Sequence, residues 1–345
     1  MTDFLDILIG GLLMGGIYAL ISMGLSLQYG VARVFNVAHG EFIMVAAFIT
    51  GILYTEANIH PLISLVIVGP ITFIIGYVLH RTISAHLRTN VPSFGQVIIL
   101  GLLIAWVLYR VWEINIWISI VTCVPAAIII DFVLSRYIYK RVKFMETPMG
   151  VFEGKSMLAF FGVFFIIQNL AKLEWGSATR DITVPGLATP VDIAGAVFQL
   201  NRLVTLGFAL GIGIAFYLFL ARTRIGKAIR AAAQDPVTAG LMGVNINQVL
   251  ALCFGFGALL AGLAGVLWSM CFSVYATMGL EKTIIAIVIV VLGGLGSIPG
   301  SFIGGIILGV IGSIVNYYEP SLTLAAYYLI FIVLLMVRPK GIMGR

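Results

Sequence analysis

Few side chains in this sequence could bind a small polar molecule, and three of them lie close together. Asn36, His39 and Glu41 stand beside a long apolar run. An amide, an imidazole and a carboxyl group can together contact a polar solute, and ionisable groups within apolar spans are costly and often functional. The same residues could instead cap a helix, or Glu41 could pair with Arg33. The sequence leaves both interpretations open.

Other residues capable of chemistry are scattered. Lys282 begins an apolar run, where it could contact a solute or extend its long side chain to a membrane surface, and Asp131 lies deeper in another run. Cys123, Cys253 and Cys271 lack the spacing of a metal site, so we expect small buried hydrophobic side chains there. Without HExxH, GxSxG or a metal-ligand cluster, we predict neither a catalytic residue nor a metal ligand.

The composition excludes a soluble enzyme. Hydrophobic residues make up 61% of the 345 residues and charged residues 10%, and the mean hydropathy is +1.11. A soluble protein is about 45–50% apolar and about 25% charged, whereas a disordered chain needs low hydrophobicity and high charge. The chain is therefore predicted to be an integral membrane protein. Its net charge of +6 is spread over loops, so we expect no nucleic-acid partner.

Apolar runs predict an all-α, polytopic membrane protein with one transmembrane domain over residues 1–345. A spanning helix needs about 20 mostly apolar residues. We expect about eleven spans, within a range of eight to eleven, at residues 5–29, 37–55, 61–80, 96–112, 116–135, 157–172, 202–220, 247–271, 281–296, 300–316 and 322–337.

Basic residues predict the orientation. They gather in alternate connections, around Arg81–Arg88, Arg136–Lys143 and Arg222–Arg230, and after Arg338. Cytoplasmic loops are rich in Lys and Arg, so the N-terminus should lie outside and the C-terminus inside a multi-pass protein of the cytoplasmic membrane, in contact with its lipids. Eleven crossings place every basic cluster on the cytoplasmic side.

Small residues recur four positions apart in several spans, which places them on one helix face. Such residues let membrane helices approach closely, and the surface they form could also slide. The predicted packing positions are Gly11, Gly15, Gly257, Ala261, Gly265, Gly296, Gly300 and Gly304.

The connection at 222–244, RTRIGKAIRAAAQDPVTAGLMGV, is longer than a simple link between two spans. Ile229, Ala232 and Ala233 share a helix face, and Asp235 before a proline is placed to cap a second short helix. We expect an alanine-rich, basic helical element on the cytoplasmic face. It could receive a partner protein or lie on anionic lipid.

This segment resembles the cytoplasmic coupling loop of permeases from branched-chain amino acid type ABC importers. Further matches follow in the same order along the chain. They are GGIYAL at 15–20, NVAHGE at 36–41, YKR at 139–141, QNL at 168–170, AGLAG at 261–265, Gly279 and Lys282, GGLGSIPG at 293–300, and RPKG at 338–341.

The resemblance implies one permease subunit of an importer that works by alternating access. It would act with a second, related permease, two cytoplasmic ATPase subunits that hold ATP and Mg, and an extracytoplasmic solute-binding protein; the chain itself would bind no cofactor. The solute would be a branched-chain amino acid or a relative such as urea, an amide or a small carboxylate. Implied ATPase-coupling residues are Gly226, Ala228, Arg230, Ala231, Ala232, Asp235, Ala239 and Gly243. Substrate-path candidates are Asn36, His39, Glu41, Gly279 and Lys282.

One region departs from the family pattern. Residues 85–135 add about two apolar runs and are interpreted as an insertion of peripheral spans, on which the family gives no guidance for Asp131. A self-sufficient secondary transporter or channel is the alternative function. Such proteins often carry internal repeats and intramembrane charges, and neither a repeat of half the chain nor many central charges occurs here.

Overall fold

The computed structural model describes residues 2–89, 149–182, 184, 187, 189–193, 196–338 and 341–344. The predicted spans 96–112 and 116–135 lie outside these residues, as does most of the predicted insertion. The chain divides into two units, Met1–Tyr77 with Phe160–Arg345, and Val78–Ala159. The first unit carries every site described below.

Helices dominate the described residues. They are α1 (Thr2–Ala32), α2 (His39–Thr55), α3 (Pro61–Thr89), α6 (Met149–Trp175), α7 (Leu200–Arg222), α8 (Arg224–Gln234), α9 (Pro236–Leu241), α10 (Ile246–Ser269), α11 (Met278–Gly293), α12 (Ile298–Tyr318), the 3-10 turn η3 (Pro320–Leu322) and α13 (Thr323–Val337). Every predicted span within the described residues coincides with one of these helices.

Seven of the described helices are long and apolar enough to cross a membrane, by length and composition. They are α1, α3, α6, α7, α10, α12 and η3 with α13. The helices α2 and α11 are shorter, with 17 and 16 residues. The prediction of a polytopic helical membrane protein is therefore confirmed, whereas the number of spans and the orientation stay predictions.

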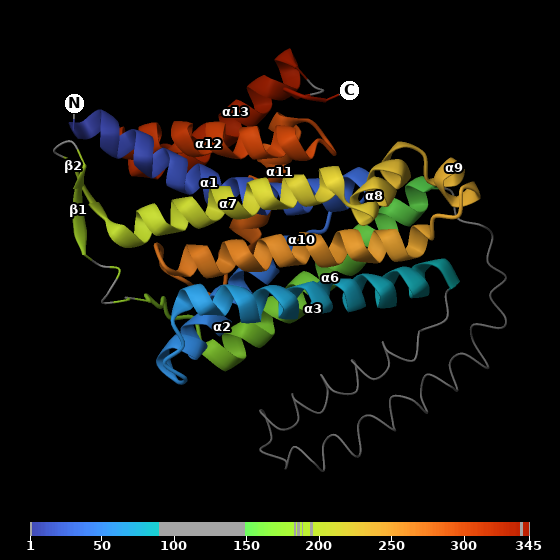
Figure 1. Ribbon diagram of the computed structural model, residues 1–345, viewed down its shortest axis with the longest axis horizontal. Coiled ribbons are helices and arrows are strands. Elements are labelled where there is room, and N and C mark those ends of the chain that lie inside the picture. The colour runs from blue at the N-terminus through green and yellow to red at the C-terminus, as the bar shows by residue number, and fades with distance from the viewer. Residues whose placement is uncertain are drawn as a thin grey trace, which may run out of the picture. The chain divides into compact units, whose positions relative to one another are not determined.

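A small sheet departs from the all-α expectation. Strands β1 (Pro190–Ile193) and β2 (Ala196–Gln199) pair antiparallel, with Pro190 opposite Gln199. The hairpin leads directly into α7, and Figure 1 shows it at the same end of the helices as the N-terminus. Four-residue strands have too few residues for an alternating pattern to stand out in a sequence this apolar.

Helix α1 is the centre of the first unit, and it packs on α12 through glycines. A Cβ built on Gly11 would lie 2.7 Å from Cα of Val310, and one on Gly15 would lie 2.7 Å from Cα of Ile306. Close backbone contact maximises dispersion attraction where lipid removes the hydrophobic drive between helices. Figure 1 shows α1 running beside α7 and α12.

Helix α10 packs through small residues on two neighbours. Gly257 lies under the Gln28 side chain of α1, and Gly265 faces the backbone of Ile43 in α2. Ala261 is fully buried between them. The predicted face of small residues on this helix thus lies in helix contacts.

The remaining glycines of that predicted set surround the two ends of the α11–α12 connection. Gly300 lies against the carbonyl of Gly293, and Gly304 against Leu292. Gly296 has a φ of +79°, a left-handed conformation that favours glycine.

The C-terminal segment after α13 also contacts the end of α11. The amides of Ile342 and Met343 donate to the carbonyls of Leu292 and Gly293, at 2.8 and 3.0 Å. The end of α11 is therefore tied by backbone hydrogen bonds as well as by packing.

Candidate functional site

The first turns of α2 and α11 meet in direct backbone contact. A Cβ on Gly40 would collide with the carbonyl oxygen of Gly279. The amide of Gly40 donates to Oγ1 of Thr283 at 2.7 Å. The same hydroxyl donates toward the carbonyls of Val37 and Gly279, which lie 3.2 and 3.1 Å away. One buried hydroxyl thus joins the two helix starts.

Asn36 and His39 hold α2 in place. Oδ1 of Asn36 accepts the amide of Ala38 at 3.1 Å, which supports the capping interpretation for this residue. Nε2 of His39 lies 2.9 Å from the carbonyl of Ile21 and donates to it. Ile21 belongs to the interior of α1, well before Ala32. Helix α2 therefore begins beside the interior of α1.

Glu41 is fully buried against Gly279. Among the described residues, neither carboxylate oxygen has a hydrogen-bond partner, so the suggested pairing with Arg33 is not formed. The carboxyl group lies at the first turns of two helices, whose N-terminal ends carry partial positive charge. Those helix ends offset part of the cost of burying it.

Glu281 and Lys282 form a charged pair on the other side of the first turn of α11. Nζ of Lys282 lies 2.6 Å from Oε1 of Glu281 and 4.0 Å from the ring centroid of Trp268. The hydroxyl of Tyr275 donates to Oε2 of Glu281 at 2.7 Å. The Lys282 side chain is only 5% exposed, so it does not extend to a surface. Sequence reasoning missed Glu281, although two opposite charges at the start of an apolar run were the available signal.

The cytoplasmic element predicted at 222–244 contains two helices, α8 and α9. Thr223 caps α8 by accepting the amide of Gly226 at 3.0 Å. Gly226, Ile229 and Ala232 are buried within the chain, and a Cβ on Gly226 would collide with the carbonyl of Leu220. Gly226 and Ala232 therefore hold α8 on its own chain and are not open to an ATPase.

Arg230 acts on the end of α7. Its guanidinium donates to the carbonyl of Leu220 and, at 3.3 Å, to that of Ala221. The last carbonyls of a helix lack partners within the helix, and a cation there interacts favourably with the helix dipole. Arg230 is also exposed, so its expected contact with a partner stays a prediction.

Helix α9 is capped as the sequence predicts. Oδ1 of Asp235 accepts the amides of Val237 and Thr238, at 2.9 and 3.1 Å. Hydrogen bonds from the side chain and amide of Thr238 hold the pKa of Asp235 below its ordinary value. Ala239 is buried, and Gly243, with a φ of +86°, turns the chain toward α10.

Three large apolar side chains of α9 and its C-cap point outward. Val237, Leu241 and Met242 are 72%, 84% and 82% exposed. Of the predicted coupling residues, Ala231, Asp235 and Gly243 are exposed and Ala228 is half-buried. Sequence reasoning missed the three apolar residues because it looked for small side chains. The available signal in the sequence was a cluster of apolar residues in a short helix that is interrupted by glycine.

No group of three His, Cys, Asp or Glu side chains in the described part of the chain could hold a metal ion. Cys253 is buried and Cys271 half-buried, both as free thiols. Cys253 thus matches the expectation of a small buried side chain, whereas Cys271 matches it only in part.

Comparisons with known proteins give a consistent result. The family model described as "Branched-chain amino acid transport system / permease component" matches residues 7–94 and 86–338. The high-affinity branched-chain amino acid transport system permease proteins LivH of Salmonella typhimurium and BraD of Pseudomonas aeruginosa are each 27% identical over 99% of this chain and 96% of their own. The ribose import permease protein RbsC of Escherichia coli is 30% identical over 47% of this chain and 46% of its own. No solved structure matches the chain significantly.

Proposed function

The chain belongs to the family of permease components of branched-chain amino acid transport systems, and from this we infer that it is a transmembrane subunit of an ABC importer in the cytoplasmic membrane. The proposed cargo is a branched-chain amino acid or a related small polar solute, moved inward by alternating access. The match of the family model over most of the chain carries this proposal.

Separate ATPase subunits would supply the energy, and α8 with α9 would be their docking element. An exposed apolar cluster outside the apolar spans is typical of a protein interface. Val237, Leu241 and Met242 form such a cluster, and the exposed Ala231 on α8 leaves room for close approach. We therefore place the docking surface on the solvent-exposed residues of α9, together with Ala231 of α8.

Two further partners complete the proposed complex. A second, related permease would pair with this chain, and an extracytoplasmic solute-binding protein would deliver the solute. Large apolar side chains of α13, such as Leu329, Ile332 and Met336, are exposed. They suit contact with lipid or with the second permease.

The test is uptake of radiolabelled L-leucine, L-isoleucine and L-valine into proteoliposomes that contain the permease pair and its ATPase subunits. Uptake should require the binding protein on one side of the membrane, where the labelled solute is added. It should also require ATP on the opposite side, where the ATPase subunits lie. It should persist when ionophores dissipate ion gradients. Uptake by this chain alone, driven by a sodium or proton gradient and indifferent to ATP, would instead establish a secondary transporter.

The same vesicles resolve the cargo. Unlabelled urea, acetamide, propionate and ribose are added in excess to the labelled amino acid. We expect L-leucine, L-isoleucine and L-valine to compete and the other solutes not to compete. Stronger competition by urea or an amide would assign the importer to that solute class instead.

A further inference from the structure

A cavity of about 500 Å³ opens in the first unit among α1, α7, α11, α12 and α13. Its lining comes from α1 between Asp6 and Tyr18, the first turns of α7, α11 and α13, and the last turns of α12 with η3, together with Phe272 after α10. Figure 1 shows α8 and α9 at the opposite end of α7. Under the predicted orientation, the cavity therefore faces the side from which a binding protein delivers its solute.

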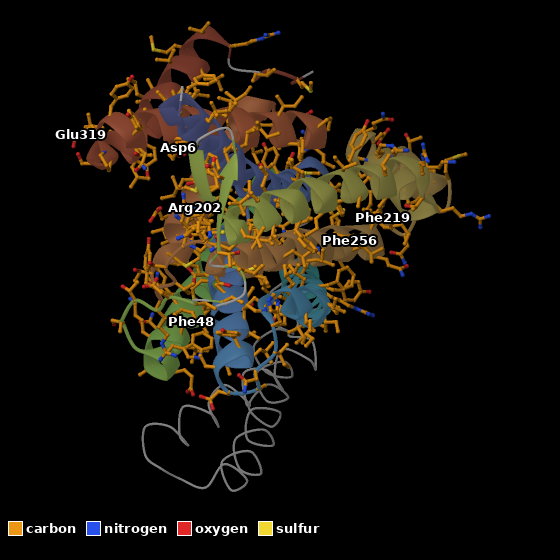
Figure 2. All side chains as sticks on the ribbon, turned by 60° about the vertical axis from the view of Figure 1, so that its left-hand side comes forward. Asp6, Phe48, Arg202, Phe219, Phe256 and Glu319 are labelled. Carbon is orange, nitrogen blue, oxygen red and sulfur yellow. The ribbon has the colours of Figure 1, made fainter. Side chains whose placement is uncertain are left out.

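Charged side chains of both signs line this cavity, two of them inside it and two at its edge. Glu281 and Lys282 are half-buried and buried, whereas Asp6 and Arg202 are exposed at its edge. Figure 2 shows Asp6 on α1 and Arg202 on α7 at the end of the helices that faces the viewer. Within the described residues, no ion pair joins Asp6 to Arg202, so both remain available to a ligand.

The remaining wall is largely apolar. Leu13, Met14, Phe272, Ile285 and Leu324 contribute aliphatic and aromatic surface. Small-molecule sites are concave, mostly apolar and supplied with a few convergent polar groups, with volumes of about 300–1,000 Å³. The cavity has the size and the composition of such a site.

We propose that this cavity is the outward-facing binding site for a zwitterionic amino acid with an aliphatic side chain. The ligand carboxylate binds between Arg202 and Lys282, and its ammonium group binds between Asp6 and Glu281. Its side chain lies on the apolar wall. The proposal rests on the proposed transport function and adds the residues that receive the solute inside the permease.

Both ligand charges are needed for this fit. Glu281 and Lys282 already neutralise each other, so a ligand of single charge would leave one member of the buried pair without compensation, which is costly. When a zwitterion binds, its carboxylate pairs with Lys282 and its ammonium group pairs with Glu281, so every charge keeps a partner.

The test is direct binding to the purified permease in nanodiscs, read by tryptophan fluorescence. Trp268 lies under the Lys282 ammonium group, so a ligand that draws this group away should change its emission. We expect L-leucine to give a saturable change that the Trp268→Phe variant lacks. Isoamylamine and isocaproate, which each keep one of the two charged groups, should bind at least tenfold more weakly.

Rim variants avoid the risk of misfolding. Asp6→Asn and Arg202→Gln change exposed side chains and should each weaken L-leucine binding about threefold to tenfold. Glu281→Gln should weaken it at least tenfold, while Glu56→Gln, at an exposed glutamate outside the cavity, should leave it unchanged. Equal binding of the three ligands, or parent-level binding in both rim variants, would overturn the proposal.

These outcomes separate the site from the function. If the assembled importer takes up L-leucine but the rim variants bind and transport like the parent, the cavity is not the site and the importer stands. If the assembled importer takes up none of the three branched-chain amino acids, the proposed function fails, whatever the binding experiment gives.

Discussion

At the scale of single residues, the contact between Gly40 and Gly279 allows no side chain. The amide of Gly40 is bonded to Thr283, and a Cβ there would collide with backbone as well as with the Thr283 hydroxyl. Backbone atoms cannot turn aside as a flexible side chain can. The contact therefore depends on glycine at position 40, whereas a Cβ on Gly279 would meet the Glu41 side chain.

Gly40→Ala should lower the thermal midpoint of the detergent-solubilised permease, because overpacking a tight contact costs about 1–3 kcal/mol. The matched control is Gly211→Ala on α7, where an added Cβ meets nothing within 4 Å. Replacing glycine by alanine inside a helix gains about 0.5–1 kcal/mol, so the control should be unchanged or more stable. Equal midpoints for the two variants would show that α2 and α11 are not in close contact.

Thr283→Val should destabilise the protein by about 1–3 kcal/mol, because it leaves the buried amide of Gly40 without its acceptor. Thr283→Ser keeps the hydroxyl and should recover most of that loss. Thermal unfolding of both variants measures the difference. A valine variant as stable as the serine variant would mean that this hydroxyl does not join the helix starts.

The sequence predicted which polar residues are unusual but not what they contact. Asn36, His39 and Glu41 were identified from their residue types beside an apolar run. Asn36 bonds the nearby amide of Ala38, but the residues that His39 and Glu41 contact, Ile21 and Gly279, are distant in the chain. No local pattern records such contacts, so the structural role of His39 could not be derived in advance.

At the scale of elements, α8 shows how an amphipathic helix can mislead. Its apolar face was correctly predicted from Ile229 and Ala232, both of which are buried. The family resemblance then assigned Ala232 to the ATPase as well. A residue on the buried face holds the helix to its own chain, and the exposed Ala231 is the one open to a partner.

The adjacent alanines give a matched pair. Ala231→Trp should insert and fold normally but lower transport and substrate-stimulated ATPase activity at least fivefold, because a bulky group on the docking surface blocks close approach. Ala232→Trp should instead lower the yield of folded protein, because that position is 1% exposed. Transport at the parent level with Ala231→Trp would remove α8 from the docking surface.

Hydropathy predicted where α1, α7, α10 and α12 lie but not the depth at which α2 and α11 begin. Mean hydropathy reports that a segment is apolar, not how far into the membrane it starts. The level of α2 depends on the His39 hydrogen bond to the interior of α1, which is a tertiary contact. The predicted insertion at 85–135 lies largely outside the described residues and stays a prediction.

At the scale of the whole molecule, loop positions test the predicted orientation. The backbones of Arg180 and Val274 pair as an isolated bridge, so the connections before α7 and after α10 share one face. Ala231 lies on α8, which follows the opposite end of α7. These two ends should lie on opposite sides of the membrane.

Single cysteines are introduced at Asp181 and Ala231 in a variant whose three native cysteines are replaced by serine. A membrane-impermeant maleimide added to intact cells should label position 181 and should label position 231 only after the membrane is opened. Detergent-opened cells provide the control for reactivity. Labelling of position 231 in intact cells would reverse the orientation and place the proposed amino acid site on the cytoplasmic side.

The attachment of α11 at both ends has a mechanical consequence. Its 16 residues form a rod about 24 Å long. One end carries the contact with α2 and the cavity-lining residues Glu281 and Lys282, and the other is tied to the C-terminal segment. Because the rod is held at both ends, a shift imposed where the C-terminal segment holds it moves the whole helix, including the residues that line the cavity. Opening and closing of the cavity would then need no bending of the helix, only its movement as a rigid body.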